Sequence, residues 1–133
     1  MNQARNLNRK DKQRPKNLDL RTVRLPVPAL VSILHRASGA VLFLLLPVLL
    51  LGLQCSLNSA EHFAHIKEVA AQPFVKLLLL GVVWAFSHHF FAGLRHIAMD
   101  FQWGMELTTA RLTAKLVLAL GLLVTLLIGT ALW

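Results

Sequence analysis

The chain has 133 residues, of which 56% are hydrophobic and only 15% are charged, well below the quarter that is usual for soluble domains. Its mean hydropathy is +0.58. This length favours a single domain, and too little polar sequence remains to coat a soluble bundle of such apolar helices. The single cysteine, Cys55, excludes an internal disulfide and a cysteine-cluster metal site.

The chain begins with a basic segment. Residues 1–24 contain eight Lys and Arg against two Asp, and this net charge of +6 (8 − 2) accounts for most of the chain's +8. Prolines favour extended backbone in the residues that precede them. We predict that residues 1–28 form an amphipathic or extended segment along the membrane surface or against a soluble partner. No recognition motif follows the basic residues, so we expect no nucleic-acid binding.

Three apolar stretches follow, and each is long enough to cross a bilayer. Residues 37–60, 77–94 and 116–133 contain no Asp, Glu, Lys or Arg, and a transmembrane helix needs about 20 mainly apolar residues. The predicted class is an all-α integral membrane protein. Residues 29–133 would form its membrane domain, with three transmembrane helices over about 29–54, 74–99 and 110–133.

The connections predict an additional helix and an orientation. Residues 58–61, with the sequence NSAE, are typical of a helix cap and predict a short amphipathic helix that runs toward Ala71. Basic segments stay on the cytoplasmic side of the membrane. The N-terminus and the second loop are therefore expected on the cytoplasmic side, and the first loop and the C-terminus outside.

A polar face lies near the start of the first span. It carries Ser32, His35, Arg36 and Gly39 at the spacing i, i+3, i+4 and i+7, which places them on one side of a helix. Ionisable residues within spans are costly and usually functional. Two simpler interpretations stay open, because Arg36 can extend to the inner surface and Ser32 can hydrogen-bond its own helix.

The second span carries a matching face near its end. His89, Gly93 and His96 have the spacing i, i+4 and i+7, whereas His88 is rotated by about 100°. Both groups fall near the cytoplasmic side, which predicts one shared site. Neutral histidine is a common haem ligand, but His89 and His96 are about 10 Å apart along the helix and cannot both ligate one iron. Helix-packing roles for these histidines stay open.

Two stretches resemble a known family. Residues 14–20 and 32–39 read RPKNLDL and SILHRASG, and residues 89–100 read HFFAGLRHIAMD. These resemble the two signatures of the cytochrome b556 subunits of bacterial succinate dehydrogenase, most strongly of the enterobacterial type. The likeness extends over nearly the whole chain and includes the order of the motifs, the three spans and the loop lengths.

The resemblance implies haem b held between this chain and a second small membrane anchor, each supplying one axial histidine. The ligand to the haem iron by motif position is His89, and His35, Arg36 and His96 match residues near the haem propionates. Ser32 and Arg36 match residues that line the ubiquinone site. The further partners implied are an iron–sulfur subunit, a flavoprotein subunit and the lipid of the bacterial inner membrane, with the C-terminus in the periplasm.

The expected function is that of a subunit of succinate:quinone oxidoreductase that does not itself react with succinate. It would pass electrons from succinate oxidation to ubiquinone. Three alternatives stay open from the residues alone: the anchor of a related fumarate reductase, a non-redox membrane protein that uses the His and Arg face for ions, and a purely structural anchor.

Overall fold

The computed structural model describes residues 24–133, and the elements within this range are four α-helices. They are α1 (Val27–Asn58), α2 (Ala60–Ala71), α3 (Pro73–Asp100) and α4 (Leu107–Leu132). Three of them, α1, α3 and α4, are long and apolar enough to cross a membrane, and the predicted all-α membrane class is therefore confirmed. Most of the predicted N-terminal segment, residues 1–23, lies outside the described residues.

The first long helix extends further than the sequence pattern predicted. Its N-cap is Pro26, whose carbonyl accepts hydrogen bonds from the N–H groups of Ala29 at 3.0 Å and Leu30 at 3.1 Å. Pro28 lies in the first turn, where a missing N–H costs nothing. Nothing interrupts the helix before Ser59, since Pro47 is accommodated within it. At 32 residues it is about 48 Å long, longer than a bilayer core of about 30 Å.

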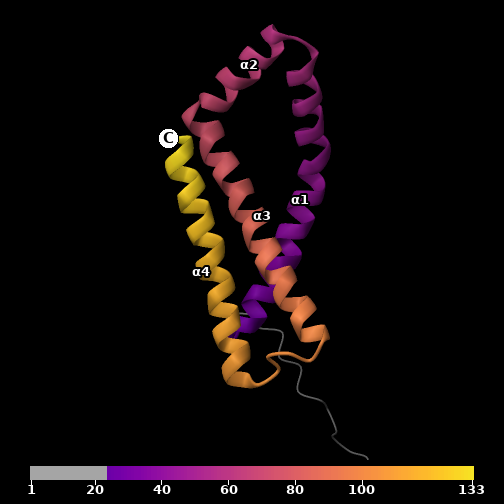
Figure 1. Cartoon of the computed structure of the whole chain (residues 1–133), viewed down its shortest axis with the longest axis vertical. Helices are drawn as coiled ribbons and strands as arrows, with labels where there is room; N and C mark the ends of the chain where they lie inside the picture. Colours follow the sequence, from indigo (N-terminus) through magenta and orange to yellow (C-terminus); the bar gives the residue numbers. More distant parts are fainter. Residues whose placement is uncertain (1–23) are drawn as a thin grey trace, which may run out of the picture.

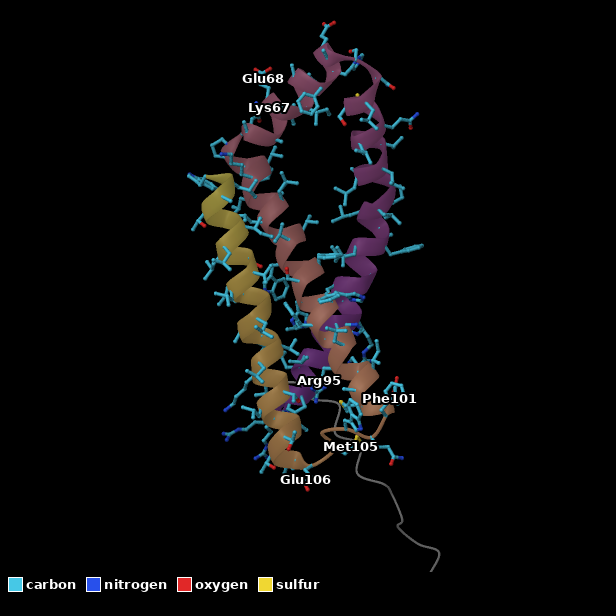
Figure 2. The ribbon with its side chains drawn as sticks, viewed as in Figure 1. Lys67, Glu68, Arg95, Phe101, Met105 and Glu106 are labelled. Atoms are coloured by element: carbon cyan, nitrogen blue, oxygen red, sulfur yellow. The ribbon has the colours of Figure 1, made fainter. Side chains whose placement is uncertain are left out.

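The short helix α2 confirms the predicted cap. The Ser59 hydroxyl accepts a hydrogen bond from the His62 N–H at 3.1 Å, and Glu61 lies in the first turn, where a negative charge suits the helix dipole. The helix ends at Ala71 with Gln72 as its C-cap, and Pro73 starts α3. Figure 1 shows α2 as a bridge between the upper ends of α1 and α3, and Figure 2 labels Lys67 and Glu68 on it.

The long helices pack unevenly. α3 and α4 run side by side along their length, whereas α1 crosses α3 in the lower half and leaves it toward α2 (Figure 1). No residue from Ala40 to Asn58 is buried within the described chain. The core cluster is Val31, Ala92, Ala114 and Val117. Small residues at this crossing let the helix backbones approach closely, and the core of the bundle therefore lies in its lower half.

The loop between α3 and α4 closes the lower end. Gln102 and Gly104 both have positive φ, 62° and 74°, a backbone region that glycine occupies without steric cost. The N–H of Gln102 donates to the Met99 carbonyl at 2.8 Å, which turns the chain back at the end of α3. Phe101 and Met105 therefore lie at the end opposite α2 (Figure 2).

A buried arginine ties α3 to α4 at the same end. Arg95 is 8% exposed. Its Nε donates to Thr113 Oγ1 at 3.1 Å, and its Nη2 donates to the Ala110 carbonyl at 3.4 Å. These bonds keep α4 against the segment of α3 that carries the histidines.

Candidate functional site

The two polar faces expected from the sequence meet where α1 crosses α3. The ring of His35 on α1 stacks on that of His89 on α3, with centroids 4.2 Å apart and planes 11° apart. The ring of His96, two turns further along α3, lies 5.0 Å from His35 at an interplanar angle of 47°. The structure therefore brings three imidazoles from two helices into one cluster, with His35 adjacent to both of the others.

The His89 ring is oriented by polar groups of α1. Its Nδ1 lies 3.0 Å from the His35 carbonyl oxygen and 3.3 Å from the Ser38 hydroxyl. The Ser38 hydroxyl itself donates to the His35 carbonyl at 2.9 Å. Because a carbonyl only accepts, Nδ1 must carry the proton that bonds to it. The other ring nitrogen, Nε2, then has a free lone pair, which is the form of histidine that binds a metal.

His88 and His89 are adjacent in sequence but have opposite environments. The His88 side chain is 0% exposed, and neither ring nitrogen has a hydrogen-bond partner among residues 24–133. Its ring stacks on Trp84 with centroids 5.4 Å apart, and its backbone lies against Gly121 of α4. His88 therefore points into the chain's own core, whereas His89 is only half-buried.

The predicted quinone residues lie one turn apart on α1. Arg36 is exposed, and its Nε donates to the Ser32 backbone carbonyl at 3.3 Å. The rest of its guanidinium has no hydrogen-bond partner within residues 24–133, and the same holds for the Ser32 hydroxyl. Ser38, by contrast, hydrogen-bonds its own helix. Ser32 and Arg36 thus present several hydrogen-bonding groups near the lower end of the bundle.

Two features of the site did not follow from the spacing. The spacing indicated no partner for Ser38, because its contact with His89 joins residues 51 apart in the chain. Gly93 shares the predicted face of the second span with His89 and His96. In the structure a Cβ at Gly93 would lie 3.5 Å from His35 Nε2, so His35 occupies the space beside it.

The residues present fit a haem better than a bare metal ion. No group of three or more His, Cys, Asp or Glu within the described range is arranged to hold a metal. One half-buried histidine with Nδ1 bonded to a carbonyl is instead typical of an axial haem ligand. The exposed Arg36 supplies a cation close to this histidine cluster, which suits the carboxylates of a haem.

Comparisons with known proteins agree with the resemblance. Residues 10–128 match the family described as succinate dehydrogenase/fumarate reductase transmembrane subunit. The chain is 35% identical over 122 residues to the succinate dehydrogenase cytochrome b556 subunit of Coxiella burnetii, covering 91% of this chain and 98% of that protein. It is 30% identical over 106 residues to the cytochrome b556 subunit of Paracoccus denitrificans, covering 80% and 82%. The cytochrome b560 subunit of Reclinomonas americana is 29% identical over 119 residues, covering 85% and 82%.

The chain therefore belongs to the family of transmembrane subunits of succinate dehydrogenase and fumarate reductase. It is a multi-pass membrane anchor, and the relatives named above place it as a subunit of the succinate dehydrogenase complex. The family membership predicted from the two motifs is confirmed.

Proposed function

We propose that this chain binds haem b through His89 and forms part of the site where ubiquinone is reduced. The observation that carries the proposal is the orientation of the His89 ring. Its Nδ1 is bonded to the His35 carbonyl, and this leaves the Nε2 lone pair free for iron. A histidine of a second small membrane anchor would hold the haem together with His89. The haem would supply reversible one-electron chemistry when bound.

The choice of His89 over His88 is supported by burial. His88 is fully buried, with its ring stacked on Trp84 and its backbone against Gly121, whereas a cofactor shared with another chain must reach a ring with an exposed edge. The His35 ring stacks on the His89 ring, and the His96 ring lies beside His35. Together with Arg36 they form the polar and cationic surroundings of the haem propionates.

The quinone site of the proposal uses Ser32 and Arg36. Succinate is oxidised in the flavoprotein subunit, and its electrons travel through the iron–sulfur subunit to ubiquinone. A reduced quinone oxygen gains negative charge, and the guanidinium of Arg36 and the hydroxyl of Ser32 would stabilise that charge by donating hydrogen bonds to it. Arg36 is suited to this because its planar fork presents several N–H donors, of which only Nε is bonded within the described residues.

The orientation follows from where the site lies. Ser32 and Arg36 are at the end of the bundle where α1 begins, which is also the end that carries Phe101 and Met105 (Figure 2). With the basic N-terminal segment in the cytoplasm of a bacterial cell, the site lies at the inner face of the inner membrane. The C-terminus, at the opposite end (Figure 1), is then periplasmic. The soluble subunits deliver electrons on the side where the quinone binds.

The test is a reduced-minus-oxidised absorbance spectrum of the purified complex. Wild type is compared with His89→Leu and with His65→Leu, which removes an exposed histidine of α2. A b-type α-band is expected in wild type and in His65→Leu, and its loss or shift in His89→Leu. An unchanged band in His89→Leu contradicts the assigned ligand, and no band in wild type contradicts the haem itself.

The ratio of succinate oxidation with ubiquinone to fumarate reduction with a low-potential quinol separates the two activities named by the family.

A further inference from the structure

We propose that Gly39 and Ser38 of α1 are positioning residues for His89. Together with the His35 carbonyl they determine where the His89 ring lies and which of its nitrogens carries the proton. Through His89 these three groups affect the affinity for haem and the reduction potential of the haem. The inference rests on the proposed role of His89 as an axial ligand.

The position of the His89 ring requires a glycine at position 39, because a Cβ there would collide with the ring. A Cβ at position 39 would lie 2.8 Å from His89 Cε1 and 3.3 Å from Nδ1, closer than carbon atoms approach without a shift. Among the glycines, Gly39 is the only one at which a Cβ would come within 3.0 Å of another residue of the range 24–133. The His89 ring also has the His35 ring against its face. A methyl group at position 39 therefore displaces or tilts the imidazole.

Ser38 helps to determine which nitrogen of the His89 ring carries the proton. It is 5% exposed, and its hydroxyl hydrogen is committed to the His35 carbonyl at 2.9 Å. The oxygen therefore presents a lone pair toward His89 Nδ1 at 3.3 Å. Both groups facing Nδ1 are then acceptors, which favours the tautomer with Nε2 free. Such outer partners orient a ligand histidine and raise its basicity, and their loss commonly weakens metal binding by about 10–100-fold.

A purely structural role for the two residues makes a different prediction. Small residues on membrane helices often serve only to let helices pack. In that case Gly39→Ala would lower the stability of the complex, while the haem retained by the assembled fraction would keep its wild-type signature. The inference requires that the signature of the bound haem itself change.

The chain offers matched controls for both substitutions. Gly52 is also in α1, and a Cβ there would meet nothing within 4 Å. Ser56 makes the same bond to its own helix as Ser38, from its hydroxyl to the Leu53 carbonyl at 2.7 Å, without a histidine contact. The variants are therefore Gly39→Ala with Gly52→Ala, and Ser38→Ala with Ser56→Ala, each in the full purified complex.

Three readouts independent of turnover test the inference: haem content per flavin, the low-spin electron paramagnetic resonance signal of the oxidised haem, and its midpoint potential. Gly39→Ala is expected to lower haem retention about 10-fold or to shift the resonance signal. Ser38→Ala, which keeps the helix packing, is expected to retain haem with a higher midpoint potential, because the His89 ring loses one acceptor at Nδ1 and becomes a less basic ligand that stabilises the oxidised iron less. Both controls should match wild type.

The outcomes separate this inference from the proposed function. A wild-type resonance signal and potential in Ser38→Ala and in assembled Gly39→Ala overturn the inference while leaving His89 as ligand. If the complex with Gly39→Ala does not assemble, the resonance signal and the midpoint potential of Ser38→Ala decide whether the inference holds. Haem that is absent from wild type, or unchanged in His89→Leu, overturns the proposed function and the inference together.

Discussion

The imidazole rings of His35 and His89 lie face to face, 4.2 Å apart, although 54 residues separate them in the chain. His35 contacts His89 twice, through its ring and through its backbone carbonyl. Only the first of these contacts depends on the side chain. Substitutions at His35 therefore distinguish support of the ring by stacking from the hydrogen bond that sets the tautomer.

His35→Phe should keep the haem, and His35→Ala should lose part of it. Phenylalanine preserves an aromatic face against His89, and both variants keep the carbonyl at 3.0 Å from Nδ1. An aromatic pair contributes about 0.5–1.5 kcal/mol, so the alanine variant should hold haem several-fold less tightly. Haem content per flavin measures the difference. Equal haem loss in both variants would mean that the imidazole nitrogen of His35, and not the stack, supports the cofactor.

Arg36→Ala should lower quinone reduction and leave succinate oxidation with an artificial dye unchanged, because the dye takes electrons before the membrane site. Arg36→Lys should remain impaired, since an ammonium keeps the charge but lacks the planar fork. Arg111, an exposed residue of α4, provides the control Arg111→Ala. Parallel assays with ubiquinone and with the dye give the ratio of quinone reduction to dye-coupled succinate oxidation. A fall of the same size in both assays would remove Arg36 from the quinone site.

Ser32→Ala should weaken quinone reduction more mildly than Arg36→Ala. The Ser32 hydroxyl makes no hydrogen bond within residues 24–133, so its removal leaves the helix intact and deletes one contact with the quinone. One hydrogen bond is worth about 1 kcal/mol, or roughly a fivefold change in kcat/KM for ubiquinone. Steady-state kinetics at varied quinone concentration measure it. Unaltered kinetics would show that Ser32 does not contact the substrate.

His88→Phe should retain haem and should be at least as stable as wild type. Both ring nitrogens of His88 are buried without partners in the described chain, and replacing an unsatisfied polar group by an apolar one of similar shape is neutral or stabilising. Phenylalanine also preserves the stack on Trp84. Thermal unfolding in detergent and the haem spectrum are the measurements. Loss of the b-type band in this variant would move the ligand from His89 to His88.

Arg95→Ala should destabilise the chain by about 2 kcal/mol, because it deletes two bonds from a charged group to α4. The partners left behind are the Thr113 hydroxyl and the Ala110 carbonyl. Arg111→Ala, at an exposed position on the same helix as these partners, is the matched control and should change little. Thermal unfolding of the complex compares the two. Equal stability of both variants would show that the contacts of Arg95 do not hold α3 to α4.

Several features of the fold were predictable because they depend on neighbouring residues alone. The three spans follow from long stretches without charge, and the start of α2 follows from the hydroxyl of Ser59 at its N-cap. The ends of the long helices were less predictable. α1 continues to Asn58, four residues beyond the expected end, because neither glycine nor proline stands between residues 54 and 59. The apolar stretch predicts the part of the helix that lies in the membrane, whereas the helix itself continues beyond that part.

The sequence by itself determined that the polar groups of two spans lie on single helix faces at similar depth, since helical periodicity and hydrophobic length are local properties. The tertiary structure alone decided how those faces meet. Whether His88 or His89 points into the core depends on Gly121 of α4, and the proton on His89 depends on Ser38 and on the His35 carbonyl. Helix rotation and crossing are set by packing between segments far apart in the chain, and no local pattern encodes them.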